Sequence, residues 1–288
     1  FRLGMLYEEA KRFDEAEAKY AAFIRAAEED KRLDPTLCYV RMGVVKARRN
    51  QIPEAVAWLG KVDGGPQYEA ARLMQARLLA SINRPSEACR VVRGIRSDSA
   101  AQRAAWRETC SEWLMAAKRY GEAYDALAEA MQLAPKSARL VYKAASAAER
   151  AGLSRRAARL FQRYIDRAPG DPQGYNALGY MLLEQGDSSA RTARLIERAH
   201  ELSGGKDPAI LDAIGWLRWG QGDAAEAERY LRLALSLLQD PEIQLHLAEV
   251  LFARGGADEA ERLVQEVLAA DKDNARALEL LKQNERGS

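Results

Sequence analysis

Residues 207–234 have the sequence DPAILDAIGWLRWGQGDAAEAERYLRLA. On either side of Gly222, apolar residues recur three and four positions apart, which places them on one face of a helix. An Asp-Pro dipeptide precedes the first segment, as expected of a helix N-cap followed by proline in the first turn. Gly215 and Ala227 are small enough to let two helices approach closely. The stretch therefore predicts a helix–turn–helix pair.

This pair recurs along the chain at a nearly constant interval. The predicted turn positions are Lys11, Asn50, Asn83, Lys118, Gly152, Gly186, Gly222 and Gly255, separated by 39, 33, 35, 34, 34, 36 and 33 residues. The second helices carry a recurrent alanine: Ala16, Ala55, Ala88, Ala123, Ala157, Ala193, Ala227 and Ala260. A helix–turn–helix unit with a period near 34 residues is typical of the tetratricopeptide repeat (TPR). We expect an all-α, right-handed superhelical solenoid of about eight helix pairs plus a C-terminal closing helix.

The predicted organisation is one repeat array over residues 1–288. It comprises a truncated first repeat (1–35), repeats two to five (36–171), repeats six to eight (172–273) and a closing helix (274–284). The 39-residue first step predicts a longer second helix in the first repeat. Because Phe1-Arg2-Leu3-Gly4 has the pattern of the middle of a helix, we expect a fragment of a longer chain, with any targeting segment or lipid anchor upstream.

Composition and charge exclude several classes of function. The formal net charge is only +2, with both signs interspersed, whereas a nucleic-acid partner would call for a basic stripe. No apolar run approaches the roughly 18 residues of a membrane span. We find no catalytic, metal-binding or cofactor-binding set and predict that the protein is not an enzyme. His200 and His246 both fall on predicted helices, where packing or surface roles are expected.

The three cysteines leave two interpretations open. Cys38, Cys89 and Cys110 have no metal-binding spacing, so they are either buried thiols or include a Cys89–Cys110 disulfide. Cys89 falls in the second helix of the third repeat and Cys110 in the first helix of the fourth, and these helices should pack together. The disulfide would require an oxidising compartment.

The outward positions of the first helices predict a protein-binding groove. Those we assign to it are Tyr142, Asn176, Tyr180, Asp212, Trp216, Trp219 and Phe252. Aromatic residues are favoured anchors at interfaces. An alternative for Trp216 and Trp219 is packing between adjacent repeats. The lysines of a carboxylate-binding TPR groove are missing around Asn176, which disfavours a peptide-terminus clamp.

Several segments resemble periplasmic TPR lipoproteins of Gram-negative bacteria. They are Tyr175–Tyr180, Ile196–Ala199, Asp207–Trp216, Asp240–Ile243, His246–Leu251 and, more faintly, Val62–Pro66. This resemblance implies an outer-membrane lipoprotein adaptor that binds a carboxyl-terminal processing protease and presents it with cell-wall hydrolases. It also implies a periplasmic location, which favours the disulfide. The alternative is a structural scaffold of an envelope assembly, such as exopolysaccharide export or pilus biogenesis.

Overall fold

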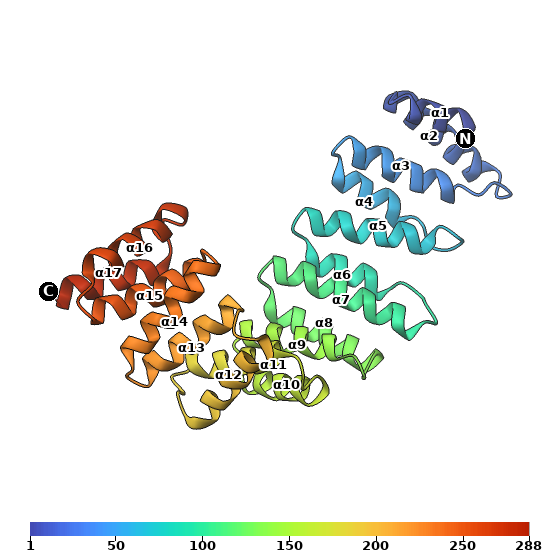
Figure 1. Cartoon of the computed structure of the whole chain (residues 1–288). Helices are drawn as coiled ribbons and strands as arrows, with labels where there is room; N and C mark the ends of the chain where they lie inside the picture. The colour runs from blue at the N-terminus through green and yellow to red at the C-terminus, as the bar shows by residue number, and fades with distance from the viewer. Residues whose placement is uncertain (288) are drawn as a thin grey trace. The chain divides into compact units, whose positions relative to one another are not determined.

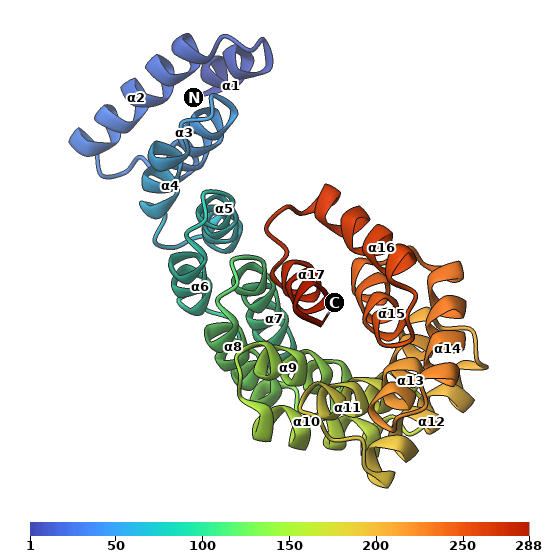
Figure 2. The same ribbon diagram turned by 90° about the vertical axis from the view of Figure 1, so that its left-hand side faces the viewer.

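The chain folds into helix pairs that pack on one another in chain order. The computed structural model describes residues 1–287, with side chains as far as Asn284, and this part contains 17 α-helices and no strand. They divide into two compact units, residues 1–153 and 154–288. Within each unit the two helices of a pair lie side by side, and each second helix also packs against the first helix of the next pair (Figures 1 and 2).

The helices of both units have the lengths expected of repeats. Unit 1 contains α1 Arg2–Glu9, α2 Phe13–Glu29, α3 Thr36–Arg48, α4 Ile52–Gly60, α5 Tyr68–Ser81, α6 Pro85–Arg93, α7 Ala100–Ala116, α8 Tyr120–Leu133 and α9 Ala138–Arg150. Unit 2 contains α10 Ser154–Arg167, α11 Pro172–Glu184, α12 Ala190–Ser203, α13 Pro208–Gly220, α14 Ala224–Leu237, α15 Pro241–Ala253, α16 Ala257–Ala270 and α17 Ala275–Gly287. The 17 residues of α2 confirm the long second helix predicted in the first repeat.

All eight predicted turn positions adopt the left-handed backbone conformation, with φ between +57° and +83°. Four of them are not glycine: Lys11, Asn50, Asn83 and Lys118. A left-handed residue between two helices reverses the chain direction, and only glycine adopts this conformation without a steric cost. The predicted helix–turn–helix rhythm is confirmed at each of these positions.

The small residues of the pairs lie where the helices are closest. The recurrent alanines are all buried. A Cβ atom at Gly215 would lie 2.7 Å from Leu231 Cγ, and one at Gly179 would lie 2.6 Å from Ile196 Cγ1. These distances are well inside van der Waals contact, so glycine is required for the two helices to pack at this separation.

Aspartates cap the first helices of the later repeats. Asp207 Oδ1 accepts hydrogen bonds from the backbone N–H groups of Ala209 and Ile210, at 2.9 and 3.3 Å. Asp171 and Asp240 accept equivalent bonds at the starts of α11 and α15. These caps satisfy N–H groups that have no partner within the helix, and they fix where each repeat begins.

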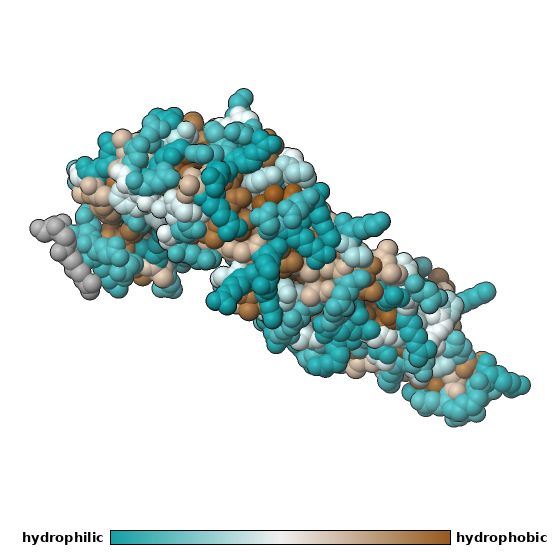
Figure 3. Space-filling model, turned by 90° about the horizontal axis from the view of Figure 1, so that it is seen from below, coloured by the Kyte–Doolittle hydropathy of each residue, from teal (hydrophilic) through white to brown (hydrophobic). Residues whose placement is uncertain are grey.

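Most of the surface drawn in Figure 3 is hydrophilic, with hydrophobic side chains in patches between polar ones. Within residues 1–287, no helix combines the length and the apolar character that a membrane crossing requires.

Candidate protein-binding surface

The first helices α11, α13 and α15, together with α17, form one continuous surface of unit 2, which we call the first-helix face. Each of these helices contacts the next one along this face. Five of the predicted groove residues are half-buried side chains of these helices: Asn176, Tyr180, Trp216, Trp219 and Phe252. Half-burial leaves each of them part of a surface while fixing its position through packing.

Asp212 was predicted to line the groove, but the structure buries it. Its residue is only 5% exposed, and its Oδ1 lies 2.7 Å from Nδ1 of His246, which is fully buried. Burial raises the pKa of Asp212, and the bond to His246 opposes this effect. Asp212 is therefore a polar member of the core between α13 and α15, since a carboxylate buried there needs a hydrogen-bond donor.

Arg276 of α17 completes this buried pair. Its Nη1 lies 3.0 Å from His246 Nε2. A guanidinium can only donate, so His246 Nε2 accepts from Arg276 and Nδ1 is left to donate to Asp212 Oδ1. The Asp212–His246 pair and Arg276 thus join α13, α15 and α17 by hydrogen bonds.

Trp216 packs between adjacent repeats, which is the alternative to a groove contact that the sequence left open. Its ring stacks on His246 with centroids 4.1 Å apart and an interplanar angle of 22°. The Arg276 guanidinium lies 5.0 Å from the centre of the Trp216 ring, within the range of a cation–π contact. Trp216 thus stabilises the α13–α15–α17 contact.

Tyr180 connects helices two repeats apart. Its hydroxyl donates a 2.6 Å hydrogen bond to Glu242 Oε1, 62 residues along the chain. Burial and this bond raise the pKa of Tyr180, so the hydroxyl remains a donor at neutral pH. On the same helix, Asn176 Oδ1 is buried and accepts no hydrogen bond within the described part of the chain.

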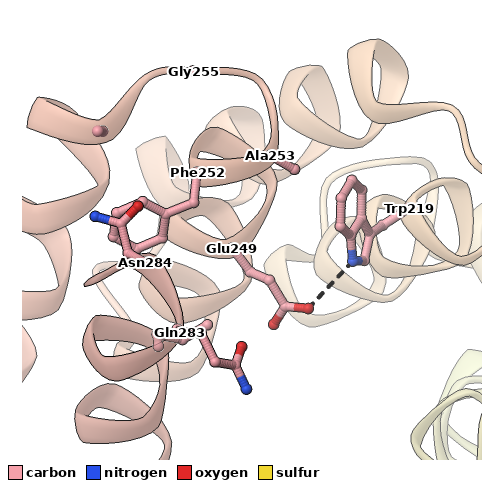
Figure 4. Close-up of a pocket in the computed structure, with 9 residues that line it drawn as sticks. Trp219, Glu249, Phe252, Ala253, Gly255, Gln283 and Asn284 are labelled. Carbon is pink, nitrogen blue, oxygen red and sulfur yellow. Dashed lines mark hydrogen bonds between the residues drawn. The ribbon is translucent and has the colours of Figure 1, made fainter. Parts of the chain in front are cut away.

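A pocket of about 540 Å³ opens at the end of this face, between α13, α15 and α17. Its lining includes Trp219, Glu249, Phe252, Leu280, Gln283 and Asn284. Figure 4 shows the Glu249 carboxylate turned toward the Trp219 indole, whose Nε1 donates to Oε1 over 3.4 Å. Trp219 and Phe252, two of the predicted groove residues, thus line the same pocket.

Tyr142 lies in unit 1 and lines a separate pocket of about 290 Å³ between α7, α8 and α9. Lys143 in the same pocket has its Nζ 2.7 Å from carboxylate oxygens of both Glu108 and Glu112. Burial opposes the charge of Lys143, but these two carboxylates outweigh it and raise its pKa. The two units therefore present pockets of different lining.

Cys89 and Cys110 form a disulfide between α6 and α7, the second of the two interpretations open for these residues. Cys38 is a buried free thiol. Burial raises its pKa to about 11. In the part of the chain that the structure describes, no group of three His, Cys, Asp or Glu side chains is arranged to hold a metal ion.

Sequence reasoning missed the contribution of α17. Arg276, Gln283 and Asn284 belong to the segment predicted to act only as a cover for the last repeat. Because α17 occupies the place of the first helix of a further repeat, its polar residues extend the first-helix face. Arg276, Glu279 and Gln283 recur three and four residues apart, and this spacing is the signal that places a polar face on this helix.

A protein-family model described as tetratricopeptide repeat matches residues 114–179 and 218–283. Both matches lie in segments with the repeated helix pairs and left-handed turns. The fold is a TPR array. Such arrays present surfaces for binding other proteins or peptides, and nothing here shows catalytic activity.

Comparisons with whole proteins support the same fold. A TPR repeat-containing protein of Pseudomonas aeruginosa is 29% identical over 211 residues, which are 73% of this chain but 36% of that relative. The chain thus spans about a third of that relative's length.

Three solved structures are similar in fold. A thermophilic TPR protein of Thermus thermophilus has a TM-score of 0.53 at 22% identity, over 64% of this chain and 97% of its own. Yeast Tom70 has a TM-score of 0.55 at 18% identity, over 95% and 59%. The hetero-tetramer Cut9–Hcn1 of the APC/C has 0.57 at 15% identity, over 94% and 52%. At these identities the likeness shows the fold alone.

Proposed function

We propose that this TPR array is a protein-binding scaffold that holds a segment of a partner on the first-helix face of unit 2. The observation that carries this proposal is the pocket between α13, α15 and α17, where Trp219 and Phe252 line a cavity of about 540 Å³. Half-buried aromatic residues on a preformed surface are favourable binding anchors, because little conformational freedom is lost when the partner arrives.

We further propose that the partner is a carboxyl-terminal processing protease, and that the array presents this protease with cell-wall hydrolases. Two considerations support it. Segments of unit 2, including Asp207–Trp216, resemble periplasmic lipoprotein adaptors. The Cys89–Cys110 disulfide suits an oxidising compartment such as the periplasm, where such a lipoprotein would be tethered to the outer membrane. In this role the array contributes binding, and the protease contributes the chemistry.

Affinity capture from a periplasmic extract tests this proposal. Wild-type array and the Phe252→Ala variant would be immobilised separately, with Leu237→Ala as a matched control, because Leu237 is an exposed apolar residue of the second helix α14. We expect the wild type and the control to retain a serine protease and hydrolases, and Phe252→Ala to retain much less of both. Recovery of export or pilus machinery instead of a protease would favour the structural scaffold and contradict the adaptor role.

A further inference from the structure

The pocket at the α13–α15–α17 end of the first-helix face has an unusual combination of groups. Two aromatic side chains, Trp219 and Phe252, lie on either side of one carboxylate, Glu249, and buried Leu280 also lines the cavity (Figure 4). An apolar side chain would contact the aromatic rings but would remove water from the Glu249 carboxylate without supplying a hydrogen-bond donor in its place. The pocket chemistry therefore calls for a ligand that is flat or apolar in one part and cationic in another.

Glu249 retains the capacity to bind such a group. Its carboxylate oxygens accept from Trp219 Nε1 and from Arg276 Nη2, each over 3.4 Å. Both contacts are about 0.5 Å longer than a typical N–H···O bond, so they are weak. A carboxylate has about four acceptor positions, and the Glu249 side chain is 32% exposed, which leaves room for a stronger donor from outside.

Other acidic groups lie behind the same pocket. The Gln283 amide nitrogen donates to Glu279 Oε1 at 3.1 Å, and the Asn284 amide nitrogen donates to Glu261 Oε1 at 3.2 Å. Figure 4 shows the Gln283 oxygen on the side of its amide that faces Glu249, where it adds a second acceptor. Arg276 offsets part of the negative charge of Glu249. Glu261 of α16 and Glu279 of α17 are thus hydrogen-bonded to two residues that line the pocket.

We propose that this pocket binds an arginine side chain of the partner, with the guanidinium against the aromatic rings and donating to Glu249. A guanidinium is planar, stacks on aromatic faces and forms paired hydrogen bonds with a carboxylate, and it is more weakly hydrated than an ammonium. This inference rests on the proposed function, because it assigns the arginine to a partner protein. It adds which kind of partner side chain enters the pocket.

Binding of N-acetyl-argininamide, followed by the indole N–H signals of the whole chain in NMR, tests the proposal without any partner. The Trp219→Phe variant assigns the signal of Trp219 among the five tryptophans. We expect a saturable shift of that signal, with a Kd on the order of 1–10 mM, as suits a single side chain. N-acetyl-citrullinamide has nearly the same shape without the charge, and it should cause no saturable shift.

Variants make the assignment specific. Glu249→Gln should raise the Kd about fivefold or more, since it removes the charge that pairs with the cation. Phe252→Leu, which keeps an apolar wall and lacks the ring, should also weaken binding. Glu184→Gln is the matched control, because Glu184 is an exposed first-helix glutamate on α11 and its loss changes the net charge equally.

The proposal would be overturned by no binding of argininamide, by equal binding of the citrulline compound or of N-acetyl-lysinamide, or by an unchanged Kd in Glu249→Gln. If argininamide does not bind while affinity capture still recovers the protease, only the arginine assignment fails. If argininamide binds and no protease is recovered, the pocket stands and the adaptor role fails.

Discussion

His246 Nδ1 and Asp212 Oδ1 lie 2.7 Å apart in the core of unit 2, and the two residues are separated by 34 positions. The bond therefore joins the successive first helices α13 and α15. Arg276 holds the opposite ring nitrogen of His246, so one buried imidazole links α13, α15 and α17. A largely apolar core thus contains a hydrogen-bonded connection among Asp212, His246 and Arg276.

Replacing His246 with leucine should strongly destabilise unit 2. His246→Leu removes the donor to a buried carboxylate, which should lower the free energy of unfolding by about 2–4 kcal/mol. Asp212→Asn should cost less, about 1 kcal/mol, because an amide oxygen still accepts from Nδ1–H while the charge that burial disfavours is gone. Urea denaturation followed by circular dichroism measures both. Equal losses in the two variants would show that the charge, rather than the hydrogen bond, is the stabilising element.

Alanine at Gly215 should force α13 and α14 apart. The new Cβ atom would meet Leu231 Cγ at 2.7 Å, and we expect Gly215→Ala to lower the free energy of unfolding by about 1–3 kcal/mol. Gly121→Ala is the matched control, because no atom lies within 4 Å of the added Cβ and its helix α8 should gain about 0.5–1 kcal/mol. Thermal denaturation of the two variants compares them. A neutral Gly215→Ala would mean that the helices can separate without cost.

Thiol titration tests the cysteine pairing. With Cys89 and Cys110 joined and Cys38 buried, the folded, unreduced protein should show no thiol that reacts rapidly with an aromatic disulfide reagent. The unfolded, unreduced protein should expose only Cys38, and the unfolded, reduced protein should expose all three cysteines. Two or more reactive thiols before reduction in periplasmically expressed protein would rule out the bridge.

Alkaline pH should destabilise the array partly through Cys38. Its pKa is raised by burial from an ordinary value near 9 to about 11, so the unfolded chain loses this proton first as the pH rises. Stability contributed by the neutral thiol is therefore complete below pH 9 and is lost between pH 9 and 11, with a slope of at most about 1.4 kcal/mol per pH unit. Cys38→Ala should lack this pH dependence. Denaturation of the wild type and the variant at several pH values measures the difference between their free energies of unfolding, which is the contribution of Cys38. If the free energy of unfolding depends on pH in the same way in both proteins, the Cys38 thiol is not shielded from water and the prediction is wrong.

The helix–turn–helix geometry could be predicted because it depends mainly on residues that are close together in the sequence. Gly152, Gly186, Gly222 and Gly255 predict a turn because their backbone can be left-handed, and the spacing of small and apolar residues predicts which helix faces meet. Lys11 and Lys118 have no such preference. Their turns were predictable only from the period, which shows that the repeat overrides local propensity.

The site was less predictable, since it depends on neighbours one or two repeats away. Helical position places Asp212 on the outward side, yet His246 of the next repeat covers it and makes it part of the core. His246 also stacks on the Trp216 ring, and this gives Trp216 a packing role. The pocket is lined by Trp219 together with Gln283 and Asn284, which lie more than 60 residues later in the sequence. The spacing of residues along one helix does not predict contacts between residues so far apart in sequence.

Site-specific photo-crosslinking tests the central claim most directly. A photoreactive amino acid would replace exposed Gln173 on the first helix α11, and, in a separate protein, exposed Leu233 on the second helix α14. Each would be irradiated with the purified carboxyl-terminal processing protease. The scaffold account predicts protease adducts from position 173 and few or none from position 233. Adducts from position 233 alone, or no adduct from either position at saturating protease, would contradict binding on the first-helix face.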